Sequence, residues 1–360
     1  MTATTFPVSA AVPRKPLQLG RAFVHPAFDL MVIGGGLSLC ALAWMKLTGS
    51  RVPSLEAVAL LAFLVNSPHF AASTVRLYTK PNAFRDLPFV TKVLPLAMLV
   101  VLGVGLALPD SFGTQLVALY FTWSPYHYAA QTYGLALMYS YRSGIQLSDG
   151  DKKLIRVACL LPFLFAFLDT RGVLLGGPTV AHALAFLLSV LRPACLVVPM
   201  LLFLAGALGR GPRLPVISIL TIVANAFWWT TLRYMDAFVW ATIFHGLQYL
   251  AIVIIFHVRE RREREPAAAP AVMGRWLRPA AEFYAVCVVV GYVLFQAWPH
   301  ASVLAHLRFS QSLLIMVAII NIHHFIVDAY IWRLRRDPNY AVVTSETGRP
   351  RVLAAVPAAG

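Results

Sequence analysis

The sequence predicts an all-α protein: a polytopic integral membrane helical bundle of about ten transmembrane helices in one domain. Of its 360 residues, 59% are hydrophobic and only 12% are charged, whereas a soluble domain carries about 25% charged residues. The mean hydropathy is +0.71. The apolar residues also gather in runs long enough to cross a bilayer, which takes about 20 residues per helix.

Ten apolar runs are candidate spans, and their limits define the predicted helices. They are residues 28–47, 55–78, 89–109, 114–141, 153–170, 180–209, 214–232, 237–257, 279–298 and 307–332. The sixth run contains Arg192-Pro193 and Pro199. Because proline interrupts helical hydrogen bonding, this run could be one kinked helix or a short re-entrant piece followed by a span.

The basic residues predict the orientation of the chain. Lysine and arginine gather in the N-terminal arm and after every second run, and the alternate loops are poor in them. The positive-inside rule then places both termini in the cytoplasm. The net charge of +15 therefore reflects cytoplasmic loops rather than nucleic-acid binding. We predict a multi-pass protein of the cell inner (plasma) membrane, with the lipid bilayer as its surroundings.

The predicted organisation is simple. Residues 1–27 form an N-terminal cytoplasmic arm, and residues 28–336 form a single transmembrane domain that includes a basic cytoplasmic loop at 258–278. Residues 337–360 are rich in Ala, Pro and Val without periodicity, so a disordered tail is predicted. The four cysteines lie singly within apolar runs, which predicts neither a disulfide framework nor a zinc knuckle.

Histidines deep inside four of the runs are the main functional signal. The deep histidines are His69, His127, His245 and the adjacent pair His323 and His324. At about 1.5 Å per residue, each lies roughly 10–22 Å from the basic residue that closes its helix. A single histidine in a span is often a hydrogen-bonding contact between helices. Five that share one layer, on helices running in the same direction, predict a shared metal site.

Polar and aromatic residues accompany these histidines. Metal-bound imidazoles usually give their second ring N–H to another polar group. We predict that such partners or proton carriers are Asn66, Ser73, Gln131, Tyr249, Asn321 and Asp328. Their spacing leaves open whether each serves the histidine of its own helix or one across the bundle. The predicted substrate pocket is lined by Trp123, Tyr126, Tyr128, Tyr133 and Phe325.

The ligand types favour a non-haem iron ion as the cofactor. Imidazole suits iron, zinc and copper, and several histidines with one carboxylate and no cysteine fit iron best. Copper and zinc stay open, and haem is less favoured. Since water is scarce at this depth, a lipid-soluble small molecule is the expected substrate. The predicted enzyme is an oxygenase or oxidoreductase for hydroxylation, desaturation or cleavage, with an electron-donor protein as a candidate partner.

Other functions fit parts of the pattern. The same histidines could form a proton- or metal-ion transport path, although the odd-numbered runs carry few polar residues. Two segments, His245-Gly-Leu-Gln-Tyr249 and His323-His324, locally resemble motifs of haem–copper oxidases, but they lie two runs apart here. The segment Phe244-His245-Gly246 resembles membrane O-acyltransferases. Bacterial carotene-cleaving membrane proteins are similar in concept, with several intramembrane histidines that bind iron.

Overall fold

The computed structural model confirms the all-α prediction. It describes residues 18–49, 54–171, 178–232, 234–263, 274–300 and 308–332. Within these ranges every regular element is a helix. The predicted tail 337–360, residues 1–17 of the predicted arm and residues 264–273 of the predicted loop lie outside the described part of the chain.

Each of the ten apolar runs lies on helical structure. The elements are α1 (Pro26–Phe28), η1 (Asp29–Ile33), α2 (Gly36–Thr48), α3 (Leu55–Leu61), η2 (Ala62–Asn66), α4 (Ser67–Thr79), α5 (Ala83–Asp86), η3 (Phe89–Val93), α6 (Leu94–Ala107), η4 (Pro109–Gly113), α7 (Thr114–Arg142), α8 (Asp149–Arg171), α9 (Pro178–Ala207), α10 (Val216–Thr231), α11 (Tyr234–Glu263), α12 (Gly274–Tyr292), η6 (Val293–Ala297) and α14 (Phe309–Ile331). The sixth run forms the single helix α9, which includes both of its prolines.

Six helical segments of the described chain are long and apolar enough to cross a membrane. They are Glu56–Thr79, Phe89–Ala107, Val180–Ala207, Tyr234–Arg262, Trp276–His300 and Phe309–Ile331. A seventh is added if Pro26–Ile33 and Gly36–Thr48, bent by 60°, form one span. The bend needs a glycine, because Gly35 has a φ of 84° and an added Cβ would lie 2.5 Å from Ala224.

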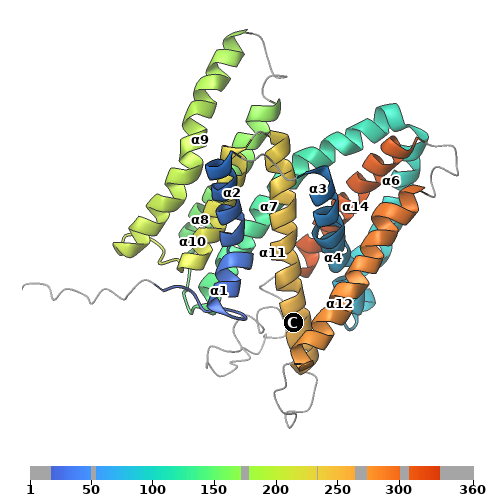
Figure 1. Cartoon of the computed structure of the whole chain (residues 1–360), viewed down its shortest axis with the longest axis horizontal. Helices are drawn as coiled ribbons and strands as arrows, with labels where there is room; N and C mark the ends of the chain where they lie inside the picture. The colour runs from blue at the N-terminus through green and yellow to red at the C-terminus, as the bar shows by residue number, and fades with distance from the viewer. Residues whose placement is uncertain are drawn as a thin grey trace, which may run out of the picture.

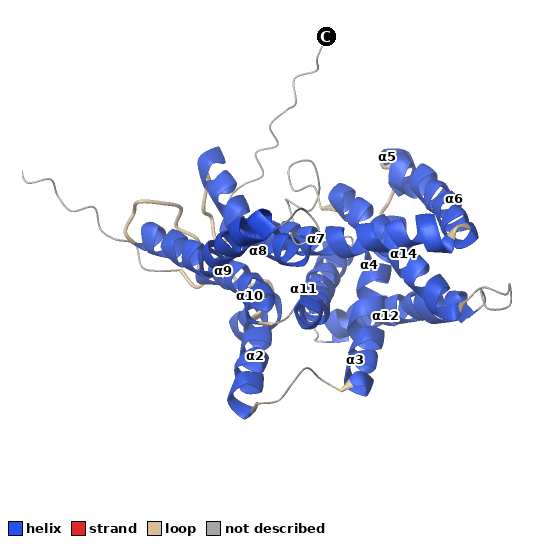
Figure 2. Ribbon diagram, turned by 90° about the horizontal axis from the view of Figure 1, so that it is seen from above, coloured by secondary structure: helices blue, strands red, loops and turns tan. Residues whose placement is uncertain are grey.

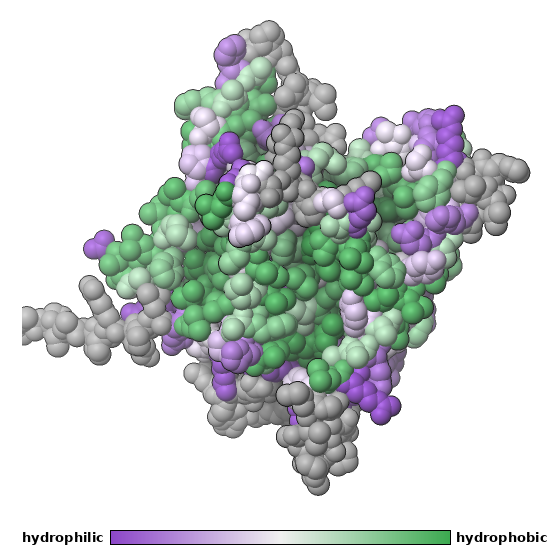
Figure 3. All heavy atoms as spheres, in the orientation of Figure 1, coloured by the Kyte–Doolittle hydropathy of each residue, from purple (hydrophilic) through white to green (hydrophobic). Residues whose placement is uncertain are grey.

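The helices form two groups that meet at α7 and α11. In Figures 1 and 2, α8, α9 and α10 lie on one side, and α4, α6, α12 and α14 lie on the other. Helix α7 packs against α8, α10 and α14, and α11 packs against α4, α10 and α12. Figure 3 shows that apolar residues cover the middle of the visible face, with hydrophilic residues towards its edges. Such a surface suits a multi-pass membrane protein.

Four helices end at the same end of the bundle, which we call the basic end. Arg76 of α4 forms an ion pair with Glu260 of α11 at 2.7 Å. The guanidinium of Arg76 also lies 5.0 Å from the ring of Trp332, which follows α14. Arg142 lies at the end of α7 and Arg259 near the end of α11. Both guanidinium groups lie over the ring of Phe23. Helices α4, α7, α11 and α14 therefore run in parallel.

Residues 18–25 form an N-terminal strap across the basic end. Arg142 donates to the backbone carbonyl of Ala22 at 2.9 Å, and Arg259 donates to that of Phe23 at 2.6 Å. The ring of Phe23 is the one that both guanidinium groups cover, at 4.3 and 5.3 Å. The strap thus ties the ends of α7 and α11 together by charge-assisted hydrogen bonds, which are the stronger kind.

The strap is held by one buried carboxylate, Asp29. This side chain is 0% exposed and accepts a hydrogen bond from the Tyr139 hydroxyl at 2.7 Å. It also accepts from the backbone N–H groups of Phe23, Val24 and His25 at 2.5, 3.2 and 3.3 Å. Because the Phe23 N–H and the Tyr139 hydroxyl would otherwise be buried without this acceptor, Asp29 fixes the strap to the bundle.

We expect the substitution Asp29→Ala to lower the free energy of unfolding by about 3 kcal/mol or more, because two buried donors, the Phe23 N–H and the Tyr139 hydroxyl, lose their acceptor. Circular dichroism during unfolding in mixed micelles would measure the change. The control is Asp149→Ala, which removes the exposed 3.0 Å ion pair with Lys152 and should cost under about 1 kcal/mol. Equal stability of the two variants would contradict the role of Asp29.

Candidate metal centre

Four buried histidines from four helices converge inside the bundle. They are His69 of α4, His127 of α7, His245 of α11 and His324 of α14. Each offers one ring nitrogen, and these nitrogens all lie within 4.8 Å of one another. Their side chains belong to residues that are 0–8% exposed. The cluster therefore matches the predicted convergence of separate spans, and it could hold a metal ion.

The four rings form a closed circuit, which we call the four-histidine cluster. The ring centroids of His69 and His245 are 4.9 Å apart, and those of His245 and His127 are 5.0 Å apart. The circuit closes through His324, at 5.0 Å from His127 and 4.6 Å from His69. Because one nitrogen of each ring lies within 4.8 Å of the others, these four residues could together hold one metal ion.

The local sequence positions His69 through a wide helical turn and a close helix contact. The π-helical turn η2 and Pro68 come directly before His69, and such turns often mark functional sites. Helix α12 presses on this turn at Gly291. A Cβ on Gly291 would lie 2.8 Å from the carbonyl carbon of Ser67. Only glycine allows α12 to support α4 so closely at this point.

Hydrogen bonding around Ser73 sets the proton position on His324. The Ser73 hydroxyl donates its only proton to the backbone carbonyl of Phe70 at 3.0 Å. It must therefore accept from His324 Nδ1, which lies 2.9 Å away. With Nδ1 protonated, neutral His324 has its lone pair on Nε2. That atom lies 3.1 Å from His69 Nε2, so the lone pair faces the cluster, as a metal ligand requires.

Three other ring nitrogens of the cluster have no hydrogen-bond partner within the described residues. One is Nδ1 of His69, and the other two are the buried Nε2 atoms of His127 and His245. Buried polar atoms are nearly always paired, and an unpaired one costs about 1–3 kcal/mol. A metal ion at the centre would satisfy the lone pairs of the two Nε2 atoms. The donor set thus fits a metal better than it fits a network of hydrogen bonds among the imidazoles.

Asp328 adds a carboxylate to the edge of the cluster. Its Oδ2 atom lies 3.4 Å from His324 Nε2 and 3.8 Å from His127 Nε2. Its Oδ1 atom accepts a hydrogen bond from the Tyr249 hydroxyl at 2.6 Å, and the Trp332 indole N–H donates to that hydroxyl at 3.4 Å. One carboxylate oxygen is therefore fixed, and the other faces the histidines.

The other predicted polar residues have different partners. Gln131 donates to the backbone carbonyl of His245 at 3.2 Å. Asn321 donates to the carbonyl of Val317, within its own helix, at 2.7 Å. The Oδ1 atom of Asn66 is buried and has no hydrogen-bond partner in the described chain. Of these three side chains, that of Gln131 donates to a residue of the cluster.

His323, which was predicted as a ligand, lies outside the four-histidine cluster. It is half-buried, whereas its neighbour His324 is 1% exposed. Successive residues of a helix point about 100° apart, so both side chains cannot face one centre. The rotation of α14 turns His324 inward and His323 away.

A cavity of about 550 Å³ lies beside the cluster, within the usual range for small-molecule sites. His127 and Asp328 line it, as do four of the five aromatic residues predicted for a pocket: Trp123, Tyr126, Tyr133 and Phe325. The fifth, Tyr128, does not line it. Tyr128 is buried, and its hydroxyl lies 2.7 Å from the Thr242 hydroxyl on α11.

Two polar residues that line this cavity were not among the predicted site residues: Gln248, which follows His245 by three residues, and Trp332. Trp332 follows Asp328 by four residues, so helical spacing places it on the same face. That spacing is the signal by which it could have been found. Gln248 donates to the backbone carbonyl of Ile33 at 2.7 Å, a contact with a distant helix that no local pattern predicts.

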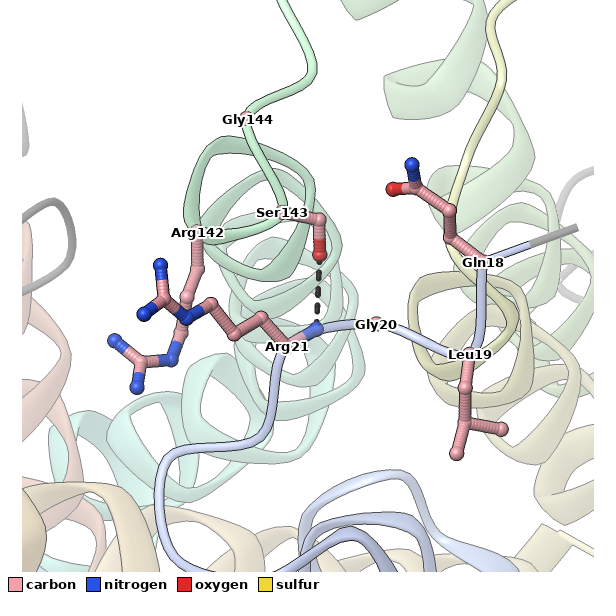
Figure 4. Close-up of a pocket in the computed structure, with 7 residues that line it drawn as sticks. All are labelled: Gln18, Leu19, Gly20, Arg21, Arg142, Ser143 and Gly144. Carbon is pink, nitrogen blue, oxygen red and sulfur yellow. Dashed lines mark hydrogen bonds between the residues drawn. The ribbon is translucent and has the colours of Figure 1, made fainter. Parts of the chain in front are cut away.

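A second cavity, of about 520 Å³, lies at the basic end between residues 18–21 and 142–144. Figure 4 shows the guanidinium groups of Arg21 and Arg142 on one side of it. The backbone N–H of Arg21 donates to the Ser143 hydroxyl at 3.0 Å. No histidine, cysteine or acidic residue lines this cavity within the described part of the chain, so the described residues offer no ligand set comparable to the cluster there.

Comparison with known proteins finds no match, whether among protein-family models, curated proteins or solved structures. The geometry of the four-histidine cluster and of its adjoining cavity therefore carries the functional interpretation.

Proposed function

We propose that this protein is an intramembrane metalloenzyme, a non-haem iron oxygenase or oxidoreductase that acts on a lipid-soluble substrate. The observation that carries the proposal is the meeting of four buried histidines from four helices beside a largely apolar cavity. Buried ionisable groups within spans persist mainly where they pair, bind or react. Here they have imidazole neighbours and an open space for a substrate.

The donor atoms favour iron over the alternatives. The group consists of imidazole nitrogens with one carboxylate oxygen at its edge, and the four cysteines are not part of it. Histidine with carboxylate is the set that non-haem iron oxygenases use. When bound, iron supplies the one-electron chemistry by which oxygen attacks unactivated hydrocarbon. Hydroxylation, desaturation and chain cleavage are the reactions in this class.

Residues of the chain would position the substrate, transfer a proton and exclude water. His127 and Asp328 line the cavity, so an ion held by the cluster would face a bound substrate. The Asp328 carboxylate and the Tyr249 hydroxyl, 2.6 Å apart, would hold or move a proton next to the centre. Apolar side chains elsewhere in the cavity would keep water out. A protein that supplies electrons is the partner this chemistry needs.

We further propose that the chain crosses a cell inner membrane ten times, with both termini on the cytoplasmic side. Support comes from helical structure on all ten apolar runs and from the gathering of Arg76, Arg142 and Arg259 at one end. Arginine at one face of a bundle is expected to be cytoplasmic. Cysteine-accessibility labelling of each loop in intact cells would test this topology.

Elemental analysis of the protein purified in lipid nanodiscs tests the metal proposal. We expect about one iron ion per chain and an absorption spectrum without a haem Soret band, because histidines and a carboxylate make up the donor set. Copper or zinc in place of iron would correct the metal and the reaction class. A protein without metal after growth in supplemented medium would contradict the proposal. Ion flux in proteoliposomes would instead indicate a transporter.

A further inference from the structure

The cavity beside the cluster is elongated along α7. Its lining begins at Trp123 and ends at Met138, fifteen residues further along the helix. At about 1.5 Å per residue this is roughly 22 Å. Along α14 the lining extends from Phe325 to Trp332, which directly follows the helix. A space of about 550 Å³ that is this long must be narrow, so it suits an extended molecule.

The cluster meets the cavity along its side. His127 lies four residues from Trp123 and eleven from Met138, which is roughly 6 Å from one end and 16 Å from the other. Asp328 likewise falls between Phe325 and Trp332 on α14. A molecule that fills the cavity would therefore pass the cluster and continue towards the basic end.

The long arm of the cavity, beyond the cluster, is mostly apolar, although Gln248 and Trp332 also line the cavity. Its walls include Leu135, Leu137, Met138 and Ile252. Among the residues that the structure describes, no lysine, arginine or glutamate lines the cavity, and Asp328 is the one acidic residue that does. A wall of this kind gains free energy by covering hydrocarbon and offers no charge to hold an ionic ligand.

The cavity opens on the outer surface between α7 and α14. Tyr126 and Ala130 of α7 and Ala329 of α14 line it and are exposed. On the opposite wall, Tyr249 and Ile252 of α11 are buried. In a membrane-spanning bundle the exposed side faces acyl chains, so a ligand can come directly from the bilayer.

We propose that this cavity binds one extended hydrocarbon chain, which enters from the bilayer between α7 and α14. The chain passes the cluster with an internal carbon next to His127 and Asp328, and one end lies in the long arm. The substrate class is then a long-chain lipid that reacts at an internal position. The reaction rests on the proposed function, whereas binding of the chain needs no metal.

Gly134 provides a direct test. It lines the cavity, seven residues beyond His127, and an added Cβ would meet no atom within 4 Å. Gly134→Phe should therefore fold and place a ring in the long arm, roughly 10 Å past the cluster. The matched control is Gly103→Phe on α6, where a Cβ also meets nothing within 4 Å and which does not line the cavity.

Binding is measured on metal-free protein in nanodiscs with an uncharged fluorescent long-chain ester, methyl cis-parinarate, displaced by methyl palmitate or methyl octanoate, and empty nanodiscs are subtracted. We expect Gly134→Phe to weaken binding of both long chains at least tenfold and that of methyl octanoate less than twofold. Gly103→Phe should match the wild type. If Gly134→Phe loses thermal stability, Gly134→Leu gives the same comparison.

Three results would overturn the inference: no saturable binding by the wild type, equal weakening of short and long chains, or no change in either. Because metal is absent throughout, none of them bears on the metal proposal. Conversely, a protein that binds long chains but never iron would refute the proposed enzyme and leave chain binding intact.

Discussion

Purified His324→Ala protein is expected to lose its metal, whereas His323→Ala protein should keep it. His324 contributes one of the four clustered nitrogens, and Ser73 fixes its orientation. Removal of a residue that merely supports a ligand costs about 10–100-fold in metal affinity, so loss of the ligand itself should cost at least about a hundredfold. Elemental analysis and competition with a chelator would measure it.

His323 is a close control because it is the same residue type on the same helix, one position away. It is half-buried and lies outside the four-histidine cluster. Both substitutions remove one imidazole from the same apolar segment, so their effects on membrane insertion should be alike. Equal metal loss in the two variants, or loss in His323→Ala alone, would show that the cluster is not the binding site.

The second large effect is expected from Asp328→Asn. A divalent ion held only by neutral imidazoles would leave two positive charges in a low-dielectric interior, which is very unfavourable. Asp328 is the carboxylate that lies against the cluster, at 3.4 Å from His324 Nε2. Its replacement should weaken metal binding by about 10–100-fold or more, measured by the same chelator competition.

Without metal, Asp328→Asn should leave the stability of the protein unchanged or raise it, whereas it weakens metal binding. A buried carboxylate without a cation costs free energy, and an asparagine oxygen can still accept the hydrogen bond from Tyr249. The metal-free Asp328→Asn protein should therefore unfold at the same temperature as the metal-free wild type or at a higher one. The metal-loaded variant should unfold at a lower temperature than the metal-loaded wild type. Asp110→Asn, at an exposed hydrogen bond with Gln311, is the control. Unchanged metal affinity in Asp328→Asn would rule out a charge-balancing role.

The helices were predictable because hydropathy is a property of the sequence itself. All ten apolar runs lie on helical structure, and six or seven spans meet the criteria of length and composition. Helices α7 and α10 belong to the ten predicted spans but not to these six or seven. Helix α7 carries polar side chains towards the cluster, and α10 has only 16 residues. A helix that lines a site resembles a soluble one in its composition.

The cluster was only partly predictable, because spacing along one helix does not give the rotation of that helix. The distance of each histidine from the basic residue that closes its helix indicated His69, His127 and His245. The same distance could not distinguish His323 from His324, because the two are adjacent. That choice depends on how α14 packs against α4 and α7.

Hydrogen bonds between side chains of different helices could not be predicted from the sequence either. Ser73 is four residues from His69, but it bonds to His324 of α14. Asp29 and the N-terminal strap it holds gave no local signal at all, because the groups that Asp29 gathers include Tyr139, 110 residues away.

The order of the four histidines along the chain has a consequence for biogenesis. His69 and His324 touch across 255 residues, and the last of the four histidines belongs to the final described helix, α14. Before α14 has been inserted, at most three of these imidazoles can meet. Under the proposed function, the four-histidine site is therefore complete only after α14 has entered the membrane, and a nascent chain arrested before that point should not hold the ion.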